Sequence, residues 1–190
     1  MAAWRTRQKA CGMSLKLKTW IYLAVGLLVS VSVCACASGK GETKFPMEPD
    51  KIIIGTAGSE REILPNDGAY REILSQMKER VDRSEAFDRV LSIAHDPESG
   101  EHASVEMRKS ETFVEFVYNA PTEQKFNTMQ AGGKATTEGI EVRCLFFPLT
   151  GEYHKCFFIG RDGNYDSAIT MGNLADNTAL ISHVRDLMAT

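Results

Sequence analysis

The sequence predicts an α+β fold, in which a mostly antiparallel sheet of about five to seven strands carries two or three helices. Three observations lead to this prediction. Short runs of β-branched and aromatic residues have the length of strands, and apolar residues recur at helical spacing in two longer segments. Stretches rich in Gly, Pro, Asn and Asp separate these runs, as turns do. We place all of these elements in one globular domain over residues 51–190.

A hairpin and a helix are the first expected elements of this domain. Residues 51–55 (KIIIG) form a short apolar run that predicts a buried strand, and residues 60–64 can pair with it after a turn. A helix is predicted over residues 67–82, where two good N-capping residues precede an apolar stripe at helical spacing. Because the stripe is narrow, we expect the helix to cover a sheet. Its apolar members are Tyr70, Ile73, Leu74, Met77 and Val81.

The middle of the domain contains one ambiguous segment and one strong strand. Residues 84–95 fit a helix capped by Ser84, or a strand over residues 90–94, and both alternatives remain open. Residues 112–118 (TFVEFVY) have high β-propensity, and the alternating residues 103–108 are expected to form a hairpin with them. The polar segment that follows, residues 121–139, predicts a long loop around two consecutive glycines.

The last part of the domain predicts three strands and a closing helix. Residues 140–147 and 153–160 have the composition of strands. A tight turn at residues 161–164 leads to a further strand over residues 165–171. A helix over residues 175–188 would then bury Leu180, Ile181, Val184, Leu187 and Met188.

Cys144 and Cys156 fall on two neighbouring predicted strands, so a disulfide between them depends on the register of the hairpin. A three-residue loop after Pro148 sets the two cysteines opposite each other. A four-residue loop that begins at Pro148 suits proline better and turns Cys156 to the other face. The alternative to the disulfide is two separate thiols that pack as small apolar residues.

The charges are divided unevenly between the two ends of the chain. The net charge is −3, but five basic residues and no acidic residue precede position 36. The remainder carries 17 basic and 25 acidic residues. An acidic domain of this kind fits nucleic acid and anionic lipid headgroups poorly, because phosphate contacts need clustered Lys and Arg. We therefore expect no nucleic-acid partner.

The N-terminal segment has the pattern of an export signal. Lys16 and Lys18 precede the uncharged apolar run of residues 20–33, which is 14 residues long. A membrane-spanning helix needs about 20 residues, whereas a signal peptide uses a shorter run. An uncleaved transmembrane anchor is the alternative. We interpret Met13 as the true first residue of this signal. Residues 1–12 would then come from a start codon that was placed too early in the gene.

The end of this run, Val33-Cys34-Ala35-Cys36, resembles the lipobox of bacterial lipoproteins. The resemblance implies a signal peptide over residues 1–35, cleavage before Cys36, and a diacylglyceryl group with palmitate-type chains on the Cys36 thiol. Cys34 departs from the motif, which usually has a small or hydroxyl residue there. Two acyl chains anchor a protein stably, so the resemblance implies an extracytoplasmic, lipid-anchored protein. The polar residues 36–50 are expected to form its tether.

The domain beyond the tether resembles, at the level of pattern only, the small uncharacterised lipoproteins of Gram-positive bacteria. Residues 51–54 with the helix that follows them, and residues 112–118, carry this resemblance. It implies no activity. We therefore expect a binding module or envelope-associated module whose partners are the membrane, through the anchor, and an envelope protein or peptide.

The alternative function uses the loop of residues 95–102. His95, Asp96, Glu98, Glu101 and His102 are close in sequence and offer nitrogen and oxygen ligands, which suggests a small envelope hydrolase or a metal-binding lipoprotein. Their spacing matches no metal motif, and the chain has no Gly-x-Ser-x-Gly or His-Glu-x-x-His sequence. We accordingly assign no catalytic residue, no metal ligand and no cofactor.

Overall fold

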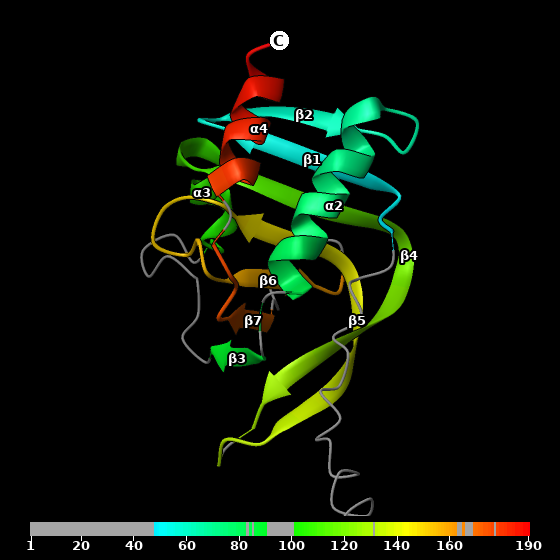
Figure 1. Cartoon of the computed structure of the whole chain (residues 1–190), viewed down its shortest axis with the longest axis vertical. Coiled ribbons are helices and arrows are strands. Elements are labelled where there is room, and N and C mark those ends of the chain that lie inside the picture. Colours follow the sequence, from blue (N-terminus) through cyan, green and yellow to red (C-terminus); the bar gives the residue numbers. More distant parts are fainter. Residues whose placement is uncertain are drawn as a thin grey trace, which may run out of the picture. The chain divides into compact units, whose positions relative to one another are not determined.

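In the part of the chain that it describes, the computed structural model shows a seven-stranded, mostly antiparallel sheet with three helices, which confirms the predicted α+β class (Figure 1). All the elements belong to the unit of residues 41–190. The residues that the structure describes are 48–82, 84, 86–90, 101–130, 132–162, 165, 169–176 and 178–190.

The strands pair in the order β2-β1-β4-β3-β7-β6-β5, and β4 also pairs with β5. Five strands therefore close into a ring, and the β1–β2 hairpin extends the sheet from the first half of β4. The strands β3 and β4 run parallel, whereas the other pairs among the described residues are antiparallel. The strands are β1 (Lys51–Thr56), β2 (Ser59–Ile63), β3 (Phe87–Val90), β4 (Thr112–Met129), β5 (Ala135–Pro148), β6 (Phe157–Gly160) and β7 (Ile169–Gly172).

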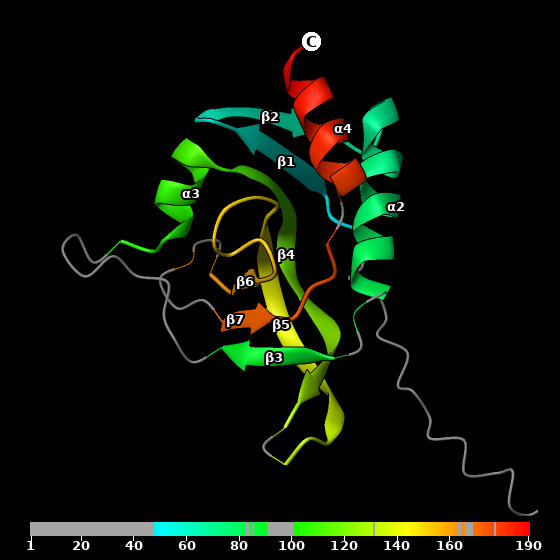
Figure 2. The same ribbon diagram turned by 60° about the vertical axis from the view of Figure 1, so that its left-hand side comes forward.

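Three helices cover the two faces of the sheet. The helices α2 (Gly68–Asp82) and α4 (Thr178–Met188) lie on one face, and the short α3 (Ser104–Ser110) lies on the other (Figure 2). The predicted helices over residues 67–82 and 175–188 are thus confirmed. Among the described residues, no helix is both long and apolar enough to span a membrane.

The β1–β2 hairpin is also as predicted. Ile54 pairs with Arg61, and Thr56 pairs with Ser59 across the two-residue turn. The turn residues Ala57 and Gly58 have φ values of 48° and 82°. A two-residue turn with two positive φ angles matches the right-handed twist of the strands that it joins.

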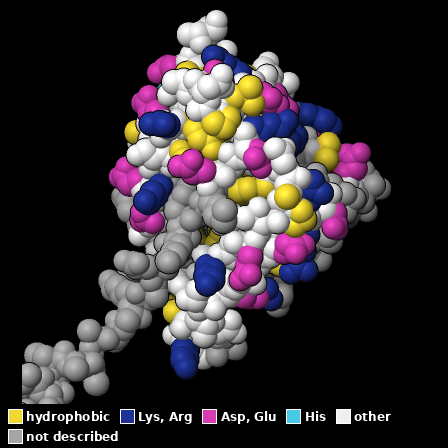
Figure 3. Space-filling model, turned by 90° about the vertical axis from the view of Figure 1, so that its right-hand side faces the viewer, with side chains coloured by type: hydrophobic (Ala, Val, Ile, Leu, Met, Phe, Trp, Pro, Cys, Tyr) yellow, Lys and Arg dark blue, Asp and Glu magenta, His cyan; other side chains and the backbone are white. Residues whose placement is uncertain are grey.

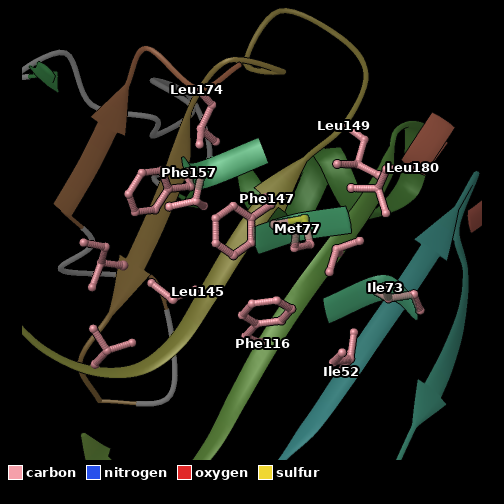
Figure 4. Packing of buried hydrophobic residues seen from close by; sticks show 14 of the residues in the cluster. Ile52, Ile73, Met77, Phe116, Leu145, Phe147, Leu149, Phe157, Leu174 and Leu180 are labelled. Atoms are coloured by element: carbon pink, nitrogen blue, oxygen red, sulfur yellow. The ribbon is translucent and has the colours of Figure 1, made fainter. Parts of the chain in front are cut away.

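The face under α2 and α4 is apolar, and it contains the larger core (Figure 4). Alternate residues of the strands point to this face, since side chains in a strand alternate between its two sides. The helices contribute the residues of their apolar stripes. The labelled members of this core are Ile52, Ile73, Met77, Phe116, Leu145, Phe147, Leu149, Phe157, Leu174 and Leu180.

Two predictions for the middle of the chain are wrong. Residues 104–110 form the helix α3 rather than a strand. Residues 121–139 do not form a long loop, because β4 continues to Met129 and pairs with β5 from Ala135 onward. The register shifts between Val117 and Thr122, which makes room for Pro121 in the strand.

The ambiguous segment and the last hairpins differ in detail from the predictions. Residues 87–90 form the strand β3, so a helix over residues 84–95 is wrong there, and residues 91–100 lie outside the described residues. The strand β6 begins at Phe157 instead of residue 153, because residues 152–155 form a turn. The strand β7 is confirmed only over residues 169–172, and most of the predicted turn before it lies outside the described residues.

Candidate functional site

Buried polar side chains gather on the face of the sheet that α3 covers. They lie among the aromatic rings of a second, smaller core that contains Phe113, Phe146 and Phe158. The polar side chains come from α3, from residue 102 just before α3, from β4 and β5, and from residue 165 after β6. We call this group the α3-side cluster, and its members are His102, Arg108, Glu115, Cys144 and Tyr165.

Glu115 is the centre of the α3-side cluster. It belongs to β4, where residues 114 and 116 point to the apolar core and Glu115 therefore points to α3; it is only 4% exposed. Arg108 Nη2 donates to one carboxylate oxygen at 2.5 Å, and the Tyr165 hydroxyl donates to the other at 2.6 Å. Both oxygens of the buried carboxylate thus have a donor, which a buried charge requires.

Arg108 links α3 to two strands. In addition to Glu115 on β4, its guanidinium donates to Glu60 on β2 at 2.9 Å. It lies over the rings of Phe113 and Phe146, at 5.1 Å from each centroid. Burial alone would lower the pKa of Arg108, but the two glutamates raise it. The side chain therefore remains charged and holds the helix against the sheet.

Cys144 and Tyr165 keep their protons in this surrounding. Burial raises the pKa of the Cys144 thiol, and the Glu115 carboxylate raises it further. Burial and Glu115 likewise raise the pKa of Tyr165 well above its ordinary value. A thiol reacts as a nucleophile when it is ionised. The arrangement therefore stabilises the fold and does not activate Cys144 for chemistry.

His102 lies inside this group rather than in solvent. Its ring stacks on Tyr165, with centroids 5.6 Å apart, and meets the edge of Phe158 at 4.9 Å. The backbone N–H of Ser104 donates to His102 Nδ1 at 3.1 Å. A neutral ring that accepts at Nδ1 carries its proton on Nε2. The lone pair of His102 Nδ1 is then engaged by the backbone of Ser104.

The metal-binding alternative rests on five residues, of which the structure describes two. His95, Asp96 and Glu98 lie outside the described residues, so the structure describes only Glu101 and His102 of that group. Glu101 is exposed, whereas His102 is buried. In the described part of the chain, no three His, Cys, Asp or Glu side chains are grouped to hold a metal ion.

The structure shows no disulfide between Cys144 and Cys156. Cys144 pairs with Gly160, so neither of the two predicted registers is present. The connection from β5 to β6 runs over residues 149–156 and is longer than a tight hairpin loop, because it contains the turn at residues 152–155. Cys144 is buried in the smaller core, and Cys156 is half-buried next to Gly172.

Sequence reasoning did not single out Arg108, Glu115 or Tyr165. One signal was present, because Glu115 interrupts an otherwise apolar strand of high β-propensity. A carboxylate in a buried strand needs a cation and hydrogen-bond donors nearby. Tyr165 is 50 positions away, and Arg108 precedes Glu115 in another element, so spacing alone could not identify them. Cys36 lies outside the described residues.

The visible surface shows no large area of one charge. Figure 3 shows basic and acidic side chains interspersed over the face that it presents, with hydrophobic side chains in small groups. No protein-family model, curated protein or solved structure matches the chain.

Proposed function

We propose that the protein is a membrane-anchored extracytoplasmic lipoprotein, whose domain is a binding module for a protein or peptide of the cell envelope. The observation that carries this proposal is the sequence Val33-Cys34-Ala35-Cys36 at the end of a 14-residue apolar run that follows basic residues. The diacylglyceryl group on Cys36 supplies two acyl chains, and two chains hold a protein on a bilayer where one does not.

The contacts of residues 49 and 50 support a tether that ends at the domain. The Tyr70 hydroxyl donates to the carbonyl of Pro49. Asp50 donates its N–H to the carbonyl of Val117 at 3.0 Å and accepts the N–H of Asn119 at 2.7 Å. The chain just before β1 is therefore fastened where β1 meets the bend of β4, and the proposed tether ends there. Residues 36–47 before this point can span at most about 40 Å.

Fatty-acid labelling tests the anchor. The full chain, expressed in a bacterium that is fed an alkyne analogue of palmitate, should acquire the label and sediment with membranes. The variant Cys36→Ser should lose both the label and the membrane fraction. Cys34→Ser is the matched control, because it changes a cysteine two residues away and should leave both properties unchanged. Label that persists in Cys36→Ser, or disappears only in Cys34→Ser, would contradict the proposal.

The β4–β5 hairpin is the surface that we assign to the partner. Its end projects beyond the remaining strands in both ribbon views (Figures 1 and 2). Met129, at the end of β4, exposes 37% of its surface there. An exposed methionine is a flexible apolar contact of the kind that binding surfaces use. Leu64, after β2, is a second exposed large apolar residue and is 42% exposed.

Photo-crosslinking distinguishes these two surfaces. A photoreactive amino acid at position 129 should give a discrete crosslinked product in intact cells, and the same group at position 64 should give much less. The two positions have similar exposure, so the second controls for random collisions. Equal yields from both positions, or no product from position 129, would contradict a binding role for the hairpin.

A further inference from the structure

The first half of β5 has an unpaired edge among the described residues. The strand pairs with β4 along both of its halves, but its pairing with β6 begins only at Cys144. Residues 135–141 therefore have β4 on one side and, in the part of the chain that the structure describes, no strand on the other. This half of β5 belongs to the projecting hairpin (Figure 1). A strand edge of this kind is a template for pairing with another chain.

The hairpin turn determines which backbone groups point out from this edge. The N–H of Gln130 donates to the carbonyl of Lys134 at 2.9 Å, so these two residues form a hydrogen-bonded pair. Hydrogen-bonded and non-hydrogen-bonded pairs alternate along an antiparallel ladder. Every second residue of β5 from position 135 is therefore in a non-hydrogen-bonded pair with β4, and its N–H and C=O groups point outward. These residues are all exposed, and they are Ala135, Thr137, Gly139 and Glu141.

The strand at the opposite end of the sheet, β2, has the protection that this part of β5 lacks. It is only five residues long, and positions 60–62 are all charged. Its Arg61 also donates to a carbonyl of α4 at 2.7 Å. Short length and charge are common ways in which proteins prevent an edge strand from pairing. In β5, residues 135–141 contain no Lys, Arg or Pro, and Glu138 is already paired with Arg89 at 2.7 Å.

Two carboxylates beside this edge determine the charge of a matching partner. Glu123 on β4 lies directly opposite Glu141 in a non-hydrogen-bonded pair, where side chains are closest. The Glu123 carboxylate also lies over Gly139, so that a side chain at position 139 would collide with it. Like charges directly opposite each other destabilise a strand pair. A Lys or Arg on an added strand would relieve this repulsion.

A second copy of the chain matches this charge poorly. If two β5 edges paired, the outward positions of the copy would lie beside the two carboxylates, since side chains of alternate residues share a face. None of the four outward residues is basic, and Glu141 of the copy would add another negative charge. The edge therefore favours a different, basic chain.

We propose that the edge of β5 over residues 135–141 is the docking site of an extended, basic segment of the partner protein, which adds to the sheet as a further strand. The outward N–H and C=O groups of β5 bond to the backbone of the segment. A Lys or Arg of the segment lies beside Glu123 and Glu141. This inference rests on the proposed role of the domain as a binding module, and it names the surface and the charge of what the domain binds.

Binding of synthetic peptides to the full chain in detergent micelles tests the charge. The probe is a seven-residue peptide of alternating valine and threonine with lysine in place of the central threonine, and its control has glutamate there. The lysine peptide should bind about fivefold more tightly, and the double variant Glu123→Gln, Glu141→Gln should remove this difference. Equal affinities for the parent protein, or a difference that persists in the double variant, would overturn the proposal.

Removal of single N–H groups tests strand addition. At position 137 the N–H points outward, so Thr137→Pro should keep the fold and weaken binding of the lysine peptide about tenfold. Thr137→Val retains the N–H and should bind like the parent. If Thr137→Pro does not fold, two lysine peptides N-methylated at residue 4 or at residue 5 decide, because only one of these N–H groups faces β5. Equal binding of these two peptides would contradict strand addition.

The crosslink from position 129 in intact cells separates this inference from the proposed function. The product should form in the parent protein and in Thr137→Val, and it should be lost in Thr137→Pro. No product in the parent would contradict the binding role itself. A product that is unchanged in Thr137→Pro would leave the binding role standing and overturn strand addition. A product that contains only this chain would overturn the basic partner and identify a second copy.

Discussion

The two faces of the sheet are covered by different kinds of interaction. Under α2 and α4 the contacts are apolar, and the core there includes fully buried phenylalanine and isoleucine side chains. Under α3 the aromatic rings surround a buried carboxylate, a guanidinium, a thiol and a phenol. A seven-residue helix provides little apolar surface, so the charged contact from Arg108 supplies what the packing cannot.

This difference indicates which face supplies the stability of the fold and which face fixes the position of the elements packed on it. Apolar burial is proportional to area and does not depend strongly on direction. A buried carboxylate depends on the placement of each donor, because a donor that moves away leaves the charge unpaired. We infer that the apolar face supplies most of the free energy of folding. The α3-side cluster fixes α3 and the side chain of Tyr165 on the opposite face.

The largest expected effect is a cavity under α2 and α4. Phe116→Ala should lower the free energy of unfolding by about 3–5 kcal/mol, because Phe116 is fully buried between the sheet and the helices. Urea titration with a near-constant slope measures this loss. Lys51→Ala, which removes an exposed pair with Glu62, should cost less than about 1 kcal/mol. A loss below about 1.5 kcal/mol for Phe116→Ala would contradict a dominant apolar face.

A smaller loss is expected when the carboxylate of the α3-side cluster is replaced. Glu115→Gln should cost about 2–3 kcal/mol, because its amide group turns a donor toward Arg108 or Tyr165 and leaves a buried group unmatched. Glu62→Gln is the control on an exposed strand position and should be close to neutral. If urea titration gives the same small change for both variants, the cluster does not hold this face.

Tyr118 on the apolar face and Tyr165 on the α3 face are both buried, and both should weaken the fold in alkali. Burial raises the pKa of Tyr118 on the apolar face, and burial with Glu115 raises that of Tyr165. The unfolded chain releases these protons near pH 10, whereas the folded chain retains them, so stability is complete below about pH 10 and falls above it. At pH 11 each tyrosine should account for about 1 kcal/mol of the loss.

Phenylalanine variants measure these contributions separately. Tyr118→Phe and Tyr165→Phe should each reduce the difference in stability between pH 8 and pH 11. Tyr165→Phe should in addition be less stable at pH 8, because Glu115 loses its hydroxyl donor. A pH dependence that neither variant reduces would be inconsistent with these assignments.

The apolar face was largely predictable from the sequence, because its signals are local. The spacing of Tyr70, Ile73 and Met77 indicates a helix whatever it covers, and the same holds for Leu180 and Val184 in α4. The hairpin of β1 and β2 has a recognisable turn. These elements owe their form to periodicity and turn chemistry within a few residues.

The α3 face and the long hairpin were not predictable by the same means. Ala103, Val105 and Met107 alternate over too few residues to distinguish the two-residue period of a strand from the 3.6-residue period of a helix. In the structure this segment is the helix α3. The second half of β4 is polar, which favoured a loop, but pairing with β5 and β3 satisfies its backbone. Tertiary context decided both cases.

The site itself depends on contacts between distant residues. Glu115 could be recognised as anomalous in its strand, but Tyr165 is 50 positions away and Arg108 faces it only because α3 is a helix. Arg80 likewise donates to the carbonyls of His154 and Ala175, which are far from it in the sequence. The proposed leader differs, since the residues Val33 to Cys36 are contiguous and their resemblance to a lipobox does not depend on the fold.

A double-mutant cycle on Arg108 and Glu115 tests most directly whether a charge-specific contact holds the α3 face. The free energy of unfolding is measured for the parent protein, Arg108→Met, Glu115→Gln and the double variant, with Lys51→Met and Glu62→Gln as the exposed control cycle. We expect a coupling of about 1–3 kcal/mol for the buried pair and less than about 0.5 kcal/mol for the control. Additive effects at Arg108 and Glu115 would contradict the account.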